Sequence, residues 1–235
     1  MNISKKLLKM LTLSVLIALG VVISPILRVE GMCPMAHLIN IVCSVLLGPM
    51  YSLLCATLIG IIRMILMGIP PLALTGAIFG AFFSGLFYRL GKGKILYAVF
   101  GEILGTGIIG AITSYPVMTF LWNKEGLSLL FYVPSFICGT LIGGSIAYLL
   151  LRKLSNSGLL PAIQEKLGSR IFEDKPSKLE NSLGILALGG ISWLVCSILK
   201  TMFSLNTKII DFISYGAIII FTIFAVLYYI SEKEA

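Results

Sequence analysis

Charged side chains are scarce in this chain of 235 residues, where Asp, Glu, Lys and Arg together make up 12% of the sequence. A water-soluble domain carries roughly a quarter charged residues, because its surface has to interact with water. The hydrophobic share is 58% and the mean hydropathy is +1.03. This composition excludes an ordinary soluble domain and predicts a protein whose outer surface faces lipid.

The strict alternation of polar and apolar residues is also missing, and this excludes a membrane β-barrel. The apolar runs are continuous, and several approach the roughly 20 residues that a helix needs to cross a bilayer. The predicted fold class is therefore all-α, a polytopic membrane protein. We predict eight spans, at about residues 7–27, 34–47, 49–67, 72–90, 95–115, 127–151, 183–205 and 209–230.

Motifs for catalysis are absent as well. No GxxxxGK[ST], HExxH or GxSxG occurs, so neither a P-loop ATPase nor a common hydrolase is indicated. One GxGxxG match, GTGIIG at residues 105–110, lies inside a predicted span, without the βαβ unit of a dinucleotide site. The five cysteines show no CxxC spacing, and we interpret them as small apolar side chains. The sequence predicts no catalytic residue, no cofactor and no metal site.

The N-terminus resembles a signal peptide, with Lys5, Lys6 and Lys9 ahead of an apolar region. That region is longer than usual and no small-x-small cleavage site follows, so we expect an uncleaved first span. The domain prediction has three parts. A six-span membrane domain covers residues 1–155, a cytoplasmic linker or interfacial helix covers 156–180, and a transmembrane hairpin covers 181–235.

The formal net charge is +8, and the basic residues gather in the short gaps between apolar runs. If the eight spans alternate, thirteen of the eighteen basic residues fall on one side, four on the other, and Arg63 within a span. This asymmetry is the positive-inside pattern. It predicts both termini in the cytoplasm and gives no reason to expect a nucleic-acid partner.

A few polar residues interrupt the apolar runs. His37, Asn40 and Ser44 share one face of the second span, where they either line a water-filled cavity or bond to other helices. Arg63 lies about one turn from the outer end of the third span, so it faces the cavity or extends to the lipid head groups. The predicted topology puts Arg63 and Glu102 in different leaflets, which makes a direct pair between them unexpected.

Glu102 shares a face of the fifth span with Thr106 and Thr113, and a carboxylate inside a membrane is a functional hypothesis by default. The alternative is structural, with bonds from Glu102 to groups of the first or fourth span. Aromatic residues around the outer loop form either an interfacial belt or a wall on which a flat ring stacks. They are Tyr115, Trp122, Phe131 and Tyr132.

Small residues recur every four positions, and this spacing lets helix backbones approach closely in lipid. On the fourth span they are Gly76, Gly80 and Ser84, with a second row at Ala77, Ala81 and Gly85. Gly101, Gly105, Gly139 and Gly143 extend the pattern to the fifth and sixth spans. On the first span the pairs Ser14/Ala18 and Gly20/Ser24 fit a partner helix as well as internal packing.

Three segments together resemble the ThiW family: PMAHLINIVCSVLLGPMYSLLCATLIGIIRMIL, TGAIFGAFFSGLFYRL and GEILGTGIIGAITSYPV. The resemblance covers roughly residues 5–155. It implies a six-helix substrate-binding (S) component of an energy-coupling factor (ECF) transporter in a bacterial cytoplasmic membrane. Hydroxyethylthiazole, a thiamine precursor, would be the substrate. A transmembrane coupling subunit and two ATPase subunits would be partners, with the coupling subunit docking near Ser14 and Ala18. The two C-terminal spans exceed the usual six.

The resulting hypothesis is an outward-facing pocket capped by residues 28–34 and 116–126. A heterocycle would stack on Trp122 or Tyr132 and receive hydrogen bonds from His37, Asn40 and Thr106. The full set of candidate binding residues is His37, Asn40, Arg63, Thr75, Glu102, Thr106, Tyr115, Trp122, Asn123 and Tyr132. Alternatives are an S component for thiamine, riboflavin or biotin, and an ion-coupled secondary transporter that works alone.

Overall fold

The structure is a computed structural model that describes residues 3–26, 28, 32–172, 177–203 and 207–231. The chain divides into two compact units, Met1–Asp174 and Lys175–Ala235, and each is described by itself. The described residues form helices and no extended strand. The prediction of an all-α membrane protein is therefore confirmed.

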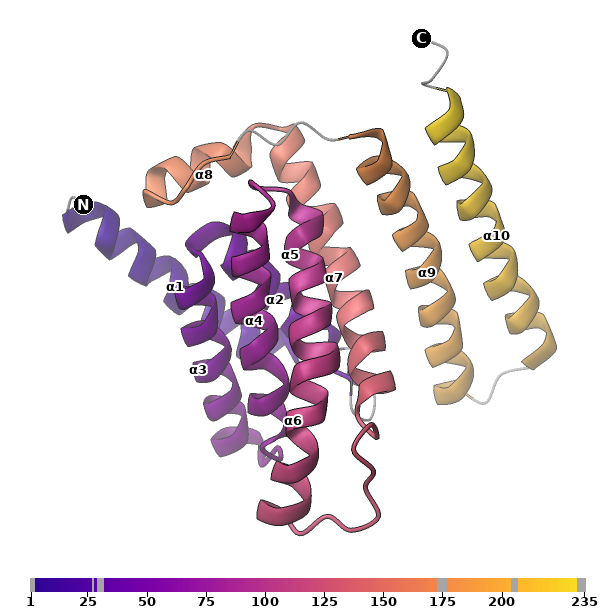
Figure 1. Ribbon diagram of the computed structural model, residues 1–235, viewed down its shortest axis with the longest axis horizontal. Coiled ribbons are helices and arrows are strands. Elements are labelled where there is room, and N and C mark those ends of the chain that lie inside the picture. The colour runs from indigo at the N-terminus through magenta and orange to yellow at the C-terminus, as the bar shows by residue number, and fades with distance from the viewer. Residues whose placement is uncertain (1–2, 27, 29–31, 173–176, 204–206, 232–235) are drawn as a thin grey trace. The chain divides into compact units, whose positions relative to one another are not determined.

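The first unit carries most of the helices (Figure 1). They are α1 (Ile3–Ile23), α2 (Pro34–Leu47), α3 (Pro49–Met67), α4 (Leu72–Leu90), α5 (Ile95–Glu102), η1 (Ile103–Gly110), α6 (Ala111–Pro116), η2 (Val117–Leu121), α7 (Val133–Asn156) and α8 (Leu159–Leu167). Within the described residues, five helices are long and apolar enough to cross a membrane. They are Ser4–Ile23, Pro49–Met67, Leu72–Leu90, Ile95–Leu121 and Val133–Asn156.

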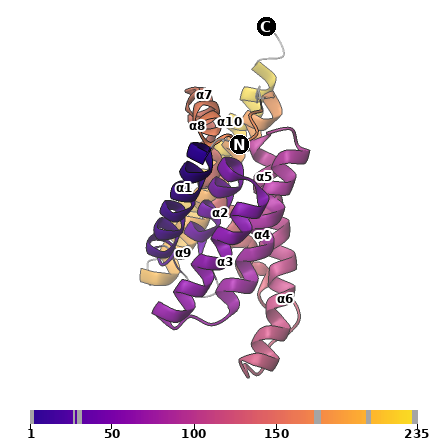
Figure 2. The same cartoon turned by 90° about the vertical axis from the view of Figure 1, so that its left-hand side faces the viewer.

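Helix α2 is the centre of this unit, because every residue except Met35 is buried. A helix that is apolar on all sides has to be enclosed by other helices, and α2 contacts α1, α3, α4, α5, α7 and α8. Figure 2 views the unit from the side of α1 and shows α2 behind α1 and α3. Its 14 residues span only about 21 Å at the helical rise, as the sequence predicts.

Glycine and proline set the ends of α2 and α3. Pro34 and Pro49 stand in the first turns of the two helices, where a missing N–H costs nothing. Gly48 joins them at φ 93° and Gly68 ends α3 at φ 60°, conformations that side chains disfavour. The chain therefore reverses sharply at both ends of α3, which places the first turns of α2 and α4 near the last turn of α3.

Glycines bring the fourth and fifth helices into backbone contact, as their four-residue spacing predicts. A Cβ on Gly105 would lie 2.6 Å from the Phe79 carbonyl oxygen and 2.7 Å from Gly80 Cα. At Gly110, a Cβ would lie 2.8 Å from the Gly76 carbonyl oxygen. These positions accept only glycine without a shift of the backbone. The GTGIIG segment thus serves helix packing rather than nucleotide binding.

Two helix boundaries differ from the sequence prediction. The fifth span continues beyond residue 115 to Leu121, and the sixth begins at Val133 rather than at 127. Pro116 lies inside the fifth span, where proline usually ends a helix. The chain instead adopts the π-helical segment η2 directly after it. Such local adjustments re-pair the freed carbonyls of membrane helices, so the proline does not stop this one.

The region predicted as a linker contains α8, which has a buried face. Gln164 is 1% exposed and its amide donates to the Val45 carbonyl at 3.0 Å and to the Tyr88 hydroxyl at 3.2 Å. Lys9 on α1 donates to the Gly168 carbonyl at 3.3 Å. Of the two expectations for this region, the helix matches the structure. Residues 173–176 of the predicted linker lie outside the described residues.

The second unit consists of α9 (Lys178–Phe203) and α10 (Thr207–Ser231). The two helices pack against each other. The Asn181 amide donates to the Tyr228 hydroxyl at 3.1 Å, and a Cβ on Gly189 would lie 2.7 Å from the Phe221 side chain. The seventh span was predicted to end at residue 205, and residues 204–206 lie outside the described residues. That this pair crosses the membrane stays a prediction.

The close approach of η1 and α4 makes a stability prediction. Gly105→Ala should destabilise the protein by about 1–3 kcal/mol, because the added methyl group meets backbone atoms that cannot rotate away. Thermal unfolding of the purified protein in detergent measures the effect. Gly216→Ala in α10 is the matched control, since its Cβ would meet nothing within 4 Å. Equal unfolding midpoints for the two variants would contradict this account of the packing.

Candidate functional site

The carboxylate of Glu102 joins three polar side chains in the middle of the first unit. Its Oε1 lies 2.8 Å from Nδ1 of His37. The same oxygen accepts hydrogen bonds from the Asn40 amide at 3.0 Å and from the Thr106 hydroxyl at 3.1 Å. Glu102 is fully buried and its partners are 6% exposed or less. Because a carboxylate only accepts, the His37 contact places a proton on Nδ1 and leaves Nε2 available for another partner.

The helices explain this convergence. His37 and Asn40 are three residues apart on one face of α2, and Thr106 follows Glu102 by four residues at the junction of α5 and η1. A side chain at Gly80 of α4 could not fit, because its Cβ would lie 2.7 Å from Glu102 Oε1. The missing side chain on α4 thus makes the space in which the polar groups meet.

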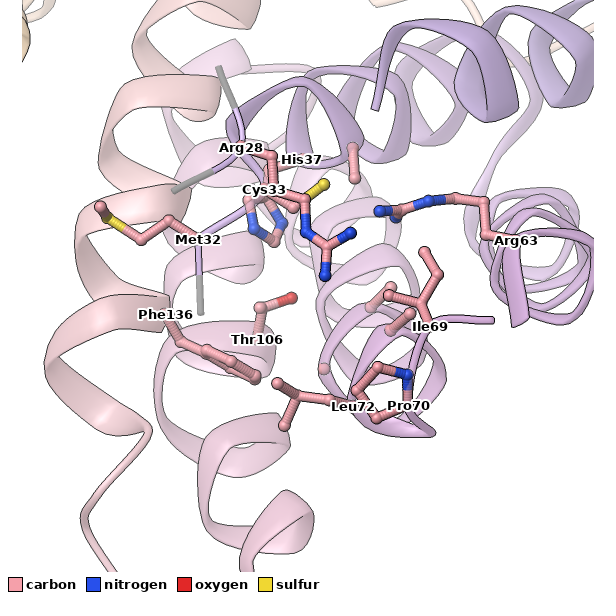
Figure 3. A pocket seen from close by; sticks show the side chains of 14 residues that line it. Arg28, Met32, Cys33, His37, Arg63, Ile69, Pro70, Leu72, Thr106 and Phe136 are labelled. Carbon is pink, nitrogen blue, oxygen red and sulfur yellow. The ribbon is translucent and has the colours of Figure 1, made fainter. Parts of the chain in front are cut away.

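A cavity of about 80 Å³ lies directly beside this cluster (Figure 3). A single water needs only about 10–15 Å³ on such a measure, so a small organic molecule or several waters would fit. Its lining comes from the first turns of α2, α4 and α7, the last turns of α3 and the middle of η1. The lining residues are Arg28, Met32, Cys33, Ala36, His37, Arg63, Ile69, Pro70, Leu72, Ala73, Gly76, Ala77, Thr106 and Phe136.

Polar and apolar groups occupy different walls of the cavity. Figure 3 shows the His37 ring on one side of the space and Phe136 and Leu72 on the other, with the Thr106 hydroxyl between them. Phe136 is 5% exposed and packs closely against Gly76. A few oriented polar groups beside an apolar, aromatic wall are the usual composition of a small-molecule site. The arrangement can bind and orient a small ring.

Arg63 turns into this cavity. It is 4% exposed, and its Nε has no hydrogen-bond partner within the part of the chain that the structure describes. Of the two sequence interpretations, extension toward the head groups and orientation toward a cavity, the structure has the second. Arg28 lines the same space from the segment before α2, although its side chain is largely exposed.

The ten predicted binding residues do not all lie at the cavity. His37, Arg63 and Thr106 line it, while Asn40 and Glu102 stand behind His37 and Thr106. Thr75 pairs with Ser114 between α4 and α6 at 2.7 Å. The remaining four residues do not line the cavity: Tyr115 is half-buried, Trp122 and Asn123 are exposed, and Tyr132 is buried beside Phe136. Their contact with a ligand stays a prediction.

Glu102 differs from expectation in its partners. The structural alternative predicted bonds to the first or fourth span, whereas Glu102 bonds to α2 and to Thr106 on the adjoining η1. Among the described residues, the ion pair of Glu102 is with His37, while Arg63 lines the cavity. His37 stands in the first turn of α2, and from there its ring reaches Glu102.

Sequence reasoning missed Phe136 and the lining from the α3–α4 connection, Ile69, Pro70 and Leu72. A signal for Phe136 existed, since it follows Tyr132 by one helical turn and faces the glycine row of α4. The predicted cap also lies partly outside the described residues, because residues 29–31 are not among them. Residues 120–126 of the second predicted cap are exposed and do not line the cavity.

The small residues of α1 divide between inside and outside. Ser14 and Ala18 are exposed, whereas Gly20 and Ser24 are buried. The Ser24 hydroxyl donates to the Gly20 carbonyl, and a Cβ on Gly20 would lie 3.4 Å from the Ile39 side chain on α2. Internal packing therefore accounts for the second pair, and the first pair remains open for another helix.

The Glu102 cluster makes a second stability prediction. Glu102→Ala should lower the free energy of unfolding by about 3–5 kcal/mol, because the buried donors of His37, Asn40 and Thr106 lose their common acceptor. Glu102→Gln should cost less, since an amide oxygen can still accept. Thermal unfolding in detergent compares both with Glu165→Gln, a substitution at an exposed carboxylate of α8. An unchanged unfolding midpoint for Glu102→Ala would show that the cluster does not stabilise the protein.

Comparison with known proteins places this arrangement in a family. A family model described as thiamine-precursor transporter protein (ThiW) matches residues 10–157. The match spans more than half of the chain and includes the cavity and the Glu102 cluster. Comparisons with the curated proteins and with the solved structures gave no match. The chain belongs to the ThiW family of thiamine-precursor transporters, and it is a multi-pass membrane protein with a helical bundle.

Proposed function

We propose that this chain is the substrate-binding subunit of an energy-coupling factor transporter that takes up a thiazole precursor of thiamine, with hydroxyethylthiazole as the first candidate. The observation that carries the proposal is the cavity beside the Glu102 cluster. It combines a fixed histidine, a threonine hydroxyl and an aromatic side chain within a membrane bundle. The membership of the chain in a thiamine-precursor transporter family supports this class of substrate.

The ligand would be held by the two walls of the cavity. Nε2 of His37 and the hydroxyl oxygen of Thr106 can accept a hydrogen bond from a hydroxyl group of the ligand, since their own protons are donated to Glu102. Phe136 offers a face for stacking. Glu102 and Asn40 do not line the cavity and would act through the residues that do. The Glu102 carboxylate fixes the ring orientation and proton position of His37, as a second layer of hydrogen bonds does in other preorganised sites.

Transport energy would come from separate subunits. The sequence contains no P-loop, so a coupling subunit and two ATPase subunits are proposed as partners. The exposed Ser14 and Ala18 of α1 are the proposed contact with the coupling subunit, because small side chains permit close helix approach in lipid. We further propose a bacterial cytoplasmic membrane with both termini on the cytoplasmic side. The N-terminus, the α4–α5 turn and α8 lie at one end of the first unit (Figure 1).

Equilibrium binding tests the substrate. Purified protein in detergent is titrated with hydroxyethylthiazole, thiamine, riboflavin and biotin in parallel by calorimetry. We expect the thiazole to bind with micromolar affinity or better and the other three at least tenfold more weakly, because a cavity of about 80 Å³ suits the smallest ring system. Tightest binding of one of the three vitamins would replace the proposed substrate.

A pair of variants tests the binding wall. Phe136→Leu should weaken thiazole binding by roughly tenfold, since a stacked aromatic contact contributes about 0.5–1.5 kcal/mol beyond its buried area. Trp122→Leu should leave the affinity unchanged, because Trp122 is 53% exposed and does not line the cavity. The opposite result, with loss only in Trp122→Leu, would favour the outer loop as the binding wall.

Reconstitution separates the proposed transporter class from an ion-coupled one. Vesicles that contain this chain alone should bind the thiazole without accumulating it under a proton or sodium gradient. Accumulation should require the coupling subunit, the ATPase subunits and ATP. Gradient-driven uptake by the single chain would exclude the energy-coupling factor mechanism, while the binding data would still report on the substrate.

A further inference from the structure

We infer that the cavity recognises a ligand with an anionic substituent, a carboxylate or a phosphate, at the end lined by Arg28 and Arg63. This inference rests on the proposed function and specifies the substrate class of the same site. Hydroxyethylthiazole is neutral and needs no counter-charge. A charged form of the thiazole would therefore fill the cavity better than the neutral alcohol.

Arg63 is the main observation. Its side chain is 96% buried, at 4% exposure, and its Nε lacks a hydrogen-bond partner among the residues that the structure describes. A buried N–H of a guanidinium without a hydrogen-bond partner is expensive, because it loses hydration without gaining a hydrogen bond. In a membrane protein such a group usually faces a cavity and marks a path or site for a ligand.

The charges around the cavity favour an anion. Figure 3 shows the guanidinium groups of Arg28 and Arg63 turned into the same space. No Asp or Glu lines the cavity among the described residues. The carboxylate of Glu102 lies behind His37 and Thr106, and its Oε1 is already engaged by His37, Asn40 and Thr106. Its Oε2 is buried without a hydrogen-bond partner, and Glu102 does not line the cavity. Among the described lining residues the charged side chains are therefore Arg28 and Arg63, which leaves a positive excess.

The shape of the arginines favours an oxyanion. A guanidinium presents its N–H groups as a planar fork that matches two oxygens of a carboxylate or phosphate. Figure 3 shows Phe136 and Leu72 on the far side of the cavity from the two guanidinium groups. A heterocycle could therefore lie against Phe136 with its anionic substituent between the two arginines, and the ring and the charge would be recognised by different walls.

Binding with three matched probes tests the inference. The probes are hydroxyethylthiazole, its phosphate monoester and the corresponding thiazole carboxylate, each titrated into the purified protein. Inorganic phosphate serves as the fourth titrant. We expect at least one anionic thiazole to bind tenfold or more tightly than the neutral alcohol. Inorganic phosphate should bind far more weakly, because it lacks the ring.

Two arginine variants identify the group responsible. Arg63→Gln should weaken binding of the anionic probe by about 30-fold or more, which corresponds to loss of one partner of a buried charge pair, and should leave the affinity for the neutral alcohol within threefold. Arg28→Gln should act in the same direction but less strongly, since Arg28 is exposed. Arg170→Gln is the matched control, because Arg170 is also exposed and lies far along the chain beyond α8.

The outcomes separate the inference from the proposed function. If the neutral alcohol binds as tightly as the anionic probes and Arg63→Gln changes neither, the inference is wrong and the proposed function stands. If no thiazole binds, both the inference and the proposed function are wrong. If inorganic phosphate binds as tightly as the phosphate ester, the ring contributes nothing and the inference is also wrong. Thermal unfolding without ligand guards against misfolding, since Arg63→Gln removes an unpaired charge and should not lower the midpoint.

Discussion

A single carboxylate oxygen organises the membrane bundle of the first unit. In lipid, a buried polar group has no water to pair with, so each one requires a partner within the protein. Oε1 of Glu102 supplies that partner for His37, Asn40 and Thr106 at once. The contacts fix the rotation of α2 against η1, and they turn one edge of His37 and the Thr106 hydroxyl toward the cavity. Structural and binding roles therefore depend on the same atom.

The cavity lies where several helix ends meet. Its lining comes from the first turns of α2, α4 and α7, the last turns of α3 and the α3–α4 connection. Glycines on α4 widen that space, since Gly76 and Gly80 leave room for Phe136 and the Glu102 cluster. The same small residues that permit close helix packing thus also shape the site.

Much of this could be predicted from the sequence, for identifiable reasons. Composition and run length predicted the all-α membrane class, four-residue spacing predicted that glycines such as Gly105 pack helices together, and the cost of charge in lipid singled out Arg63 and Glu102. Partner choice could not be predicted, because it depends on the depth at which α2 starts. The continuation of the fifth span through Pro116 was missed since a π-helical adjustment leaves no local signature. Phe136 was missed because, in the sequence of a membrane span, a phenylalanine that lines a cavity cannot be told from one that faces lipid.

The contacts of α8 have a consequence for where an independently stable unit ends. The family match stops at residue 157, yet Gln164 holds the carbonyl at the end of α2 and the hydroxyl of Tyr88 on α4. Phe172 then stacks edge-on against the same Tyr88, with ring centres 5.5 Å apart. A chain shortened at the family boundary would uncover these groups. The shortest segment that keeps these contacts therefore reaches to about Phe172. Helix α8 covers the end of the bundle opposite the cavity.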